Sequence, residues 1–305
     1  MIVAPDADGI RRAAELLRAG SVVAFPTETV YGLGADAFNE DAVAEIYRLK
    51  NRPSWNPLIV HVADVTAARA LAEEWPDGAN ELAAQFWPGP LTLVVGRAGG
   101  AGTIALRVPA HEVARKLLDA TGLALAAPSA NRSESISPTT AQHVLRSLPE
   151  VPLILDGGPT AWGIESTVVD VTCDLPRLLR PGALPLRDIR QVTGAIELPG
   201  TVLDGAARPA PGMSKRHYAP RAKVVLTDDV SAVTGVVEPA AVLTYETEDV
   251  PGAEILSVDP REYAADLYAA LHRLDDRGVA TIIVRNPPAT EEWMAVRDRL
   301  TRAAA

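Results

Sequence analysis

Side chains that bind anions recur at the ends of short apolar runs in the first part of the chain. Five segments show this arrangement, and their polar members are mostly hydroxyls with a few lysines and arginines. The members are Thr27, Thr29 and Tyr31; Lys50, Arg52 and His61; Arg107; Ser129, Asn131, Ser133, Ser135 and Ser137; and Ser166, Thr167 and Arg180. The sequence shows no Ser–His–Asp spacing, no metal-ligand cluster and no P-loop. Hydroxyls and cations with almost no general base favour phosphoryl or nucleotidyl transfer, in which positioning and charge carry most of the rate.

Arg107 is the most informative of these residues. It stands in "TIALRVP", a run that otherwise predicts a buried strand. A lone buried guanidinium costs several kcal/mol, so this side chain must be paired. A carboxylate, from the protein or from a substrate, is the expected partner because the planar fork binds it through two hydrogen bonds.

Structural explanations remain open for the other segments. Lys50 and Arg52 follow a predicted helix, where cations also complement the macrodipole. His61 lies in a predicted strand and is equally typical of a core histidine. Ser137 is also a candidate N-cap, and residues 26–34 also suit a strand-to-helix loop capped by Thr and Asp.

Alternating periodicities predict an α/β fold that is not a simple doubly wound sheet. We expect residues 91–97 and 103–109 to form a hairpin. Further helices are expected over residues 10–20, 40–50, 64–75 (capped by Asp64), 111–122, 137–148 and 260–278 and at the C-terminus. Further strands are expected over 21–25, 57–62, 123–128, 153–158, 166–172, 222–227, 240–245 and 280–284. Proline and glycine then divide the chain into a catalytic domain (1–204), a basic linker (205–221) and a small α/β domain (222–305).

Composition limits the class of protein. The chain has 305 residues, 48% of them hydrophobic, and a net charge of −10, which argues against a surface built for nucleic acid. A single cysteine, Cys173, excludes an internal disulfide and fits a reducing compartment. No signal peptide and no run of about 18 apolar residues is visible, so we expect a cytoplasmic protein with no membrane partner. Residues 206–223 contain five cations and no acid, namely Arg208, Lys215, Arg216, Arg221 and Lys223.

Seven motifs in this order resemble those of the YrdC-type threonylcarbamoyl-AMP synthases, in the long form with an extra C-terminal domain. They are "PTETVYGL", "KNRPSWNPL", "LRVP", "APSAN", "GIESTVVD", "LRPG" and "HYAP", and they extend from residue 26 to residue 220. The resemblance implies a twisted mixed sheet with helices and a concave positive face, followed by a smaller Rossmann-like α/β domain.

The resemblance also implies a reaction in which L-threonine, bicarbonate and ATP give threonylcarbamoyl-AMP and pyrophosphate. Magnesium would accompany ATP. The product would serve the threonylcarbamoyladenosine modification of tRNA, so the implied partners are downstream threonylcarbamoyl-transfer proteins and tRNA itself. By this resemblance the threonine site comprises Thr29, His61, Arg107, the backbone at Ala127, and Ser166. The ATP side comprises Lys50, Arg52, Asn56, Thr103, Ser129, Asn131, Ser137, Arg180 and Tyr218, with Lys50 and Arg52 as the catalytic pair. No protein side chain is expected to ligate a metal.

Two further expectations concern loops. Tyr218 and the basic linker are expected to fold over ATP as a lid and exclude water. Related sequences often have glycine where this chain has Glu134, and a carboxylate beside a phosphate-binding loop is unfavourable unless it points to solvent or holds magnesium.

Two other classes of function stay under consideration. One is an RNA-binding module without catalysis, which the acidic net charge disfavours. The other is a carbamoyl transferase with another acceptor, which the single cysteine disfavours, because those enzymes usually carry cysteine-rich zinc segments.

Overall fold

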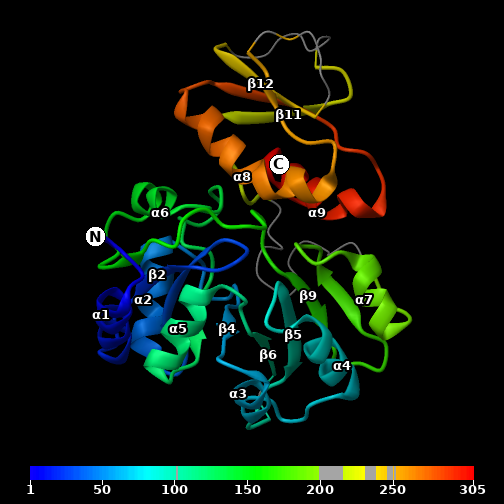
Figure 1. Cartoon of the computed structure of the whole chain (residues 1–305). Helices are drawn as coiled ribbons and strands as arrows, with labels where there is room; N and C mark the ends of the chain where they lie inside the picture. The colour runs from blue at the N-terminus through cyan, green and yellow to red at the C-terminus, as the bar shows by residue number, and fades with distance from the viewer. Residues whose placement is uncertain (101, 199–215, 231–237, 246–249, 251) are drawn as a thin grey trace.

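Two β-sheets organise the chain in the computed structural model, which describes all residues except 101, 199–215, 231–237, 246–249 and 251 (Figure 1). The first sheet is mixed and has ten strands. In sheet order they are β1 (Ile2–Val3), β8 (Ile154–Leu155), β2 (Val23–Pro26), β3 (Tyr31–Asp36), β7 (Leu125–Ala126), β4 (Ile59–His61), β6 (Thr103–Arg107), β5 (Leu91–Gly96), β9 (Thr167–Asp170) and β10 (Arg177–Arg180). The predicted hairpin is confirmed, because β5 and β6 pair antiparallel.

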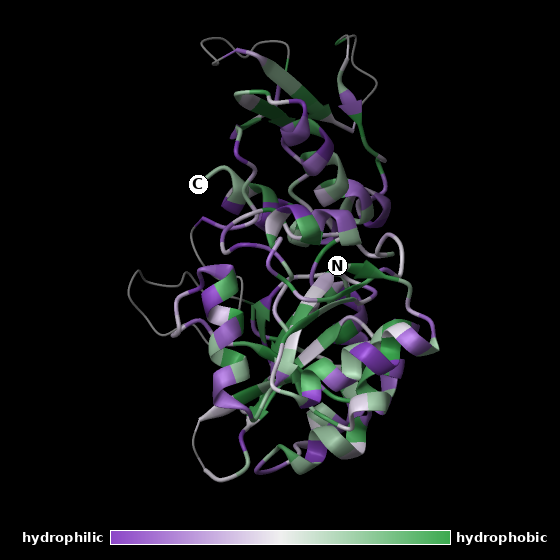
Figure 2. Cartoon of the chain, turned by 90° about the vertical axis from the view of Figure 1, so that its left-hand side faces the viewer, coloured by the Kyte–Doolittle hydropathy of each residue, from purple (hydrophilic) through white to green (hydrophobic). Residues whose placement is uncertain are grey.

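Seven helices accompany this sheet within the described residues. They are α1 (Ala7–Arg18), α2 (Glu40–Lys50), α3 (Val65–Ala70), α4 (Asp77–Phe86), α5 (Glu112–Thr121), α6 (Ala141–Ser147) and α7 (Leu186–Thr193). Helix α2 has the predicted bounds, and its buried residues Ala42, Ile46 and Leu49 recur at helical spacing. Colouring by hydropathy shows strands that are largely apolar and helices with one polar face (Figure 2).

Helix α3 begins as predicted but ends early. Asp64 caps it by accepting from the Ala67 amide, but the helix stops at Ala70 instead of continuing to residue 75. The chain then turns to meet the first sheet, since the Glu73 amide donates to the carbonyl of Gly96 at the end of β5. Tertiary pairing therefore overrides the local helix signal.

The stretch from residue 26 to residue 34 is only partly a loop, so that expectation is wrong from Tyr31 onward. Strand β3 begins at Tyr31 and pairs antiparallel with β2. A Cβ on Gly34 would lie 2.6 Å from the ring of Phe25, so glycine is needed here for the close approach of two strands.

The second sheet is parallel and has four strands, in the order β11 (Lys223–Thr227), β14 (Thr281–Arg285), β12 (Ala240–Thr244) and β13 (Glu254–Ile255). Helices α8 (Pro260–Asp276) and α9 (Met294–Ala303), with a 3₁₀ turn at Glu291–Trp293, lie between this sheet and the rest of the protein (Figure 1). Their apolar core continues into the first unit through Val30, Ile136, Ile164 and Ala183. The predicted α/β class with a smaller second α/β unit is therefore confirmed.

The predicted domain boundary at residue 204 lies outside the described residues, as does the linker from 205 to 215. Its last residues, 216–221, are described and pack against the second unit. In the described part of the chain no helix has both the length and the apolar character needed to cross a bilayer.

Candidate active site

A cavity of about 520 Å³, including its mouth, opens where several strands of the first sheet end. Its walls come from the 27–32 segment, the ends of β4, β6 and β10, the start of the 127–129 loop, and residues 217 and 218. The lining residues are Thr27, Thr29, Val30, Gly32, Arg52, Ile59, His61, Arg107, Ala127, Pro128, Ser129, Glu165, Ser166, Arg180, His217 and Tyr218. Motifs that are far apart in sequence thus converge on one enclosed space.

Arg107 lines one part of this cavity. Its Nη2 donates to Glu28 Oε1 at 2.6 Å, its Nη1 to Thr29 Oγ1 at 2.9 Å, and its Nε to the Gly89 carbonyl at 3.2 Å. The predicted buried pairing is therefore confirmed, and the partner within the protein is Glu28. A guanidinium has five N–H donors, so two remain available for a ligand.

His61 lies beside Arg107 because β4 and β6 are parallel and place these two residues in register. Burial and, to a smaller extent, the nearby charge of Arg107 lower the pKa of His61 to about 3. The imidazole is consequently neutral at physiological pH and adds no second positive charge. Its Nδ1 is buried without a hydrogen-bond partner among the described residues.

Ser166 lines the cavity and directly precedes β9. Its hydroxyl is 2.8 Å from Thr92 Oγ1, and Arg180 donates to both its carbonyl and its hydroxyl. Arg180 is buried, which lowers its pKa. Ser166 therefore holds the Arg180 guanidinium in place in the cavity wall.

Arg52 is the third arginine that lines the cavity, whereas Lys50 lies behind the wall. The Arg52 guanidinium is fixed by Asn56, whose Oδ1 accepts from Nη2 at 2.7 Å. Burial lowers the pKa of Arg52 to about 10, which leaves it charged at neutral pH. Lys50 Nζ donates to the carbonyls of Ser129 and Asn131, and burial holds its pKa well below the usual range. Lys50 thus holds the 129–131 backbone in place.

The serine-rich loop that follows β7 is anchored at several points. Ser129 lines the cavity, and the Asn131 side-chain amide donates to the carbonyls of Arg132 and Ser135. Ser137 is not the N-cap of helix α6, because Thr140 caps it. The Ser137 hydroxyl instead donates to Glu165 Oε1 at 2.6 Å.

Glu165 and His217 belong to quoted motifs but were missed as site residues. Burial alone would raise the pKa of Glu165, but Arg299, Arg180 and the Ser137 hydrogen bond outweigh it and hold the pKa at about 2. His217 and Tyr218 are both buried in the cavity wall. The available signal for Glu165 was an acid in an otherwise apolar run, directly before the hydroxyl residues Ser166 and Thr167, since a buried carboxylate must be paired.

Several buried polar atoms around this cavity lack hydrogen-bond partners among the described residues. They are His61 Nδ1, Asn131 Oδ1, His217 Nδ1 and Tyr218 OH. Buried polar groups are nearly always satisfied, so this concentration is expected of a surface that binds a polar ligand.

The structure brings together most residues of the predicted site. All five residues assigned to threonine line the cavity, as do Arg52, Ser129, Arg180 and Tyr218. Lys50, Asn56, Asn131 and Ser137 lie one layer behind and contact lining residues or the loop that carries them. Thr103 is not brought together with them. It is exposed at the start of β6, four residues before Arg107 and so about 13 Å away along the strand.

Glu134 takes a left-handed conformation with φ of 69°, which explains why glycine suits this position. Its side chain is exposed, so the carboxylate points to solvent rather than into the cavity. Its carbonyl accepts from the Ala219 amide at 2.8 Å and fixes the chain next to Tyr218.

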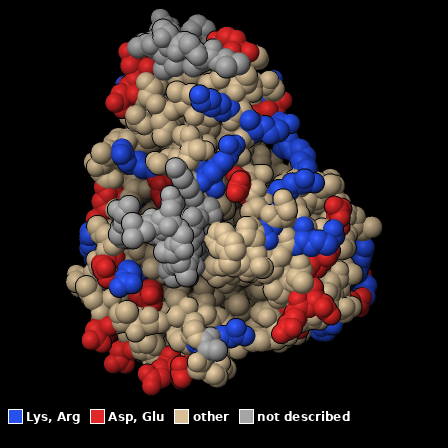
Figure 3. Space-filling model, turned by 180° about the vertical axis from the view of Figure 1, so that it is seen from behind, with Lys and Arg blue, Asp and Glu red and all other residues tan. Residues whose placement is uncertain are grey.

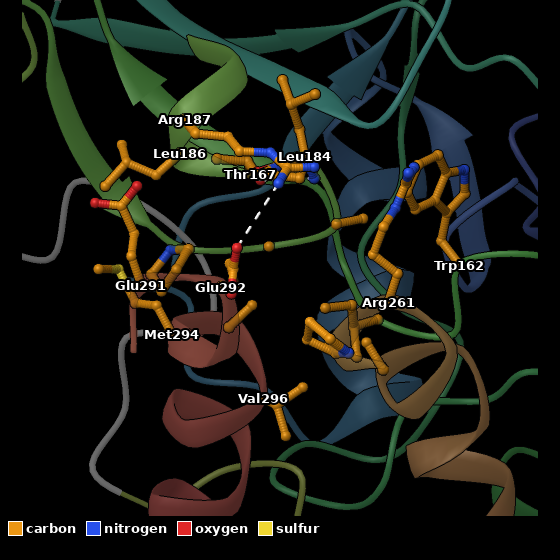
Figure 4. A pocket seen from close by; sticks show the side chains of 18 of the residues that line it. Trp162, Thr167, Leu184, Leu186, Arg187, Arg261, Glu291, Glu292, Met294 and Val296 are labelled. Atoms are coloured by element: carbon orange, nitrogen blue, oxygen red, sulfur yellow. Dashed lines mark hydrogen bonds and ion pairs between the residues drawn. The ribbon is translucent and has the colours of Figure 1, made fainter. Parts of the chain in front are cut away.

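A second cavity lies between the two units and holds none of the residues assigned to threonine or ATP. Figure 4 shows its walls, which include Leu184, Leu186 and Val296 together with the ion pair of Arg187 and Glu292, 3.7 Å apart. On the face seen from behind, acidic side chains group along the lower edge and basic ones are more frequent across the middle (Figure 3).

Known proteins match this chain along its full length. Residues 15–182 match the family model of Sua5, YciO and YrdC, described as telomere recombination, and residues 184–305 match the C-terminal domain of threonylcarbamoyl-AMP synthase. The threonylcarbamoyl-AMP synthase of Pyrococcus abyssi is 41% identical over 97% of this chain and 94% of its own length. The synthase of Bacillus subtilis is 40% identical over 97% and 92%.

A crystal structure of P. abyssi Sua5 in complex with L-threonine superposes with a TM-score of 0.90 at 40% identity, covering all of this chain and 97% of the other. Family models, full-length relatives and fold therefore agree, and the chain belongs to the threonylcarbamoyl-AMP synthase family, in its form with a C-terminal domain.

Proposed function

We propose that this protein makes threonylcarbamoyl-AMP and pyrophosphate from L-threonine, bicarbonate and ATP. The observation that carries the proposal is one cavity lined by two chemically different groups of residues. One group is Arg107 with the Thr29 hydroxyl and the neutral His61, and the other is Arg52, Arg180 and Ser129. Relatives that span the whole chain carry the name of this activity.

Threonine would bind beside Arg107. The two unused N–H groups of Arg107 suit the substrate carboxylate, and Glu28 holds the guanidinium in the required plane. Thr29 and Ser166 add hydroxyls that match a small polar side chain. Ala127 and Ile59 limit the space on the apolar side.

ATP would bind beside the second group. Arg52 and Arg180 lie in the wall and would offset charge on the phosphates, while Lys50 fixes the 129–131 backbone. Magnesium would arrive as the MgATP complex, held mainly by phosphate oxygens.

The chemistry follows from this inventory. Threonine and bicarbonate condense to a carbamate and water; a carbamate oxygen then bonds to the α-phosphorus while the bond to the bridging oxygen of pyrophosphate breaks. The carboxylates beside the cavity are paired with arginines, so neither Glu28 nor Glu165 is placed as a general base. Rate acceleration would come from in-line positioning, charge stabilisation and exclusion of water from the labile carbamate.

We also propose that the adenylate passes to proteins that transfer the threonylcarbamoyl group to tRNA, and that this occurs in the cytoplasm. The expected lid remains a prediction, because most of the linker lies outside the described residues. The described part of the linker, residues 216–221, supports a role in forming one wall of the cavity and in contacting the second unit. Tyr218 already lines the cavity, and Arg221 forms an exposed ion pair with Asp275.

A steady-state pyrophosphate assay with single amino acids tests the function. Threonine should support turnover only with ATP and bicarbonate, and serine and valine should be poor, because serine lacks the methyl group and valine lacks the hydroxyl. Comparable turnover with most amino acids, or none with threonine, would reject the proposal.

A further inference from the structure

Two side chains of the second unit contact Glu165 in the wall of the cavity, Arg299 of helix α9 and Tyr268 of helix α8. The Arg299 guanidinium is fully buried, and its Nε donates to Glu165 Oε2 at 2.8 Å across the boundary between the two units. Its Nη1 donates to Asp298 at 2.6 Å. Its Nη2 has no hydrogen-bond partner among the described residues.

The acceptor, Glu165, lines the cavity and is held from three sides. Ser137 donates to one carboxylate oxygen, and Tyr268 of helix α8 lies 3.0 Å from the other. A Cβ on Gly182 would lie 2.5 Å from the Glu165 carbonyl oxygen, so the "LRPG" turn packs directly on the same backbone. A change in the position of the Glu165 carboxylate would therefore affect Ser137 directly.

Arg299 also holds Tyr218. Its guanidinium carbon lies 4.9 Å from the centre of the Tyr218 ring, and the ring of Tyr268 stacks at 5.7 Å. Tyr218 has a φ of 60°, a left-handed conformation that is unfavourable for residues other than glycine. Such a conformation persists only where surrounding groups fix it.

Docking of the two units does not by itself require a buried charge. The shared apolar core already joins them, and a buried ion pair is often no more stabilising than apolar side chains of the same size. The planar guanidinium of Arg299 instead fixes the orientation of two groups that line the cavity, the Glu165 carboxylate and the Tyr218 ring.

We infer that Arg299 is a positioning residue for the nucleotide side of the site, acting through Glu165 and Tyr218, with Tyr268 as its support. The inference rests on the proposed function. It assigns to the C-terminal unit a part in the reaction: the unit completes the wall against which ATP is held.

The test is steady-state kinetics on the full chain with Arg299→Met, Arg299→Lys and Tyr268→Phe. Loss of a hydrogen bond to a charged group predicts that Arg299→Met lowers kcat/KM for ATP about tenfold to a hundredfold, with the KM for threonine within about twofold. Arg299→Lys should recover part of this loss, because it keeps a charged donor. Tyr268→Phe should weaken ATP use by a smaller factor.

Arg261→Met is the matched control. Arg261 also belongs to the second unit and contacts the first, with its guanidinium carbon 5.0 Å from the centre of the Trp162 ring, but it does not contact Glu165 (Figure 4). Its kinetics should stay near wild type.

Provided that the wild-type protein is active, either of two results would overturn the inference. The first is a loss of kcat/KM for ATP in Arg261→Met as large as that in Arg299→Met. The second is an Arg299→Met variant in which the kinetic constants for ATP and for threonine are impaired equally. If Arg299→Met does not fold, the inference is tested with Arg299→Lys and Tyr268→Phe. Wild-type kinetics for ATP in both of these variants would reject the inference. An inactive wild type would instead reject the proposed function.

Discussion

Arg107 and Glu28 form a buried ion pair in which Nη2 and Oε1 are 2.6 Å apart, next to Thr29. The pair offsets the charge of Arg107 before any substrate binds and fixes the plane of its guanidinium. A substrate carboxylate would therefore meet an oriented fork rather than a mobile cation.

Arg107→Lys should raise the KM for threonine by about tenfold to a hundredfold, because lysine keeps the charge but loses the fork. The KM for ATP should change little. Initial rates measured against each substrate separate the two effects, and Arg97→Lys, at an exposed arginine, is the control. Loss of ATP affinity instead would show that Arg107 serves the other ligand.

Arg52→Ala should show the opposite selectivity. Removal of a buried arginine from the cavity wall should raise the KM for ATP by about tenfold or more and leave threonine affinity near wild type. Lys50→Met should act in the same direction, since it releases the carbonyls of Ser129 and Asn131. Arg48→Ala is the control for a general loss of charge, because Arg48 lies on helix α2 like Lys50 but is exposed and paired with Glu45. A larger effect on threonine than on ATP would contradict the assignment.

Periodicity predicted much of this fold. Helix α2 and the β5–β6 hairpin have strong local patterns, and the structure has both. Strand β3 was missed because Gly32 and Gly34 resemble a turn in sequence, although they serve close packing against β2. Which strands are neighbours depends on contacts that a local pattern does not contain.

The site was predictable where its residues belong to local motifs. The resemblance named residues that mostly converge on one cavity. It gave no indication of Arg299 and Tyr268, because each acts on Glu165 from more than 100 residues away and from an ordinary helical pattern. Thr103 was assigned to the ATP side by the resemblance, but it lies at the opposite end of strand β6 from Arg107.

Glu134→Gly should stabilise the protein by about 0.5–1 kcal/mol, because glycine accepts a φ of 69° without the penalty of a Cβ. Glu134→Ala removes the carboxylate but keeps the Cβ, so it separates the backbone effect from the charge. Denaturant unfolding of both variants measures the difference. Equal stability of the glycine and alanine variants would contradict the backbone explanation.

Stability should fall as the pH drops below about 6.5. Burial lowers the pKa of His61, His143 and His217 to about 3 and that of His272 to about 4, against an ordinary value of 6.5. Between these pH values the unfolded chain binds protons that the folded chain does not. Each histidine therefore lowers the free energy of unfolding by up to about 1.4 kcal/mol for each unit by which the pH falls.

Urea unfolding at pH 7 and pH 5, at equal ionic strength, measures this slope. The rings of His143 and His272 stack 3.8 Å apart, and His272→Gln should reduce the slope. An unfolding free energy that is the same at both values of pH would contradict the burial of neutral histidines.

Identification of the reaction product tests the proposed activity without intermediate assumptions. Purified protein is incubated with MgATP, L-threonine and ¹³C-labelled bicarbonate and quenched rapidly, and the mixture is analysed by mass spectrometry. We expect threonylcarbamoyl-AMP that carries one ¹³C atom, formed without RNA and absent when threonine or bicarbonate is omitted. No adenylate, or an adenylate without the label, would contradict the proposed activity.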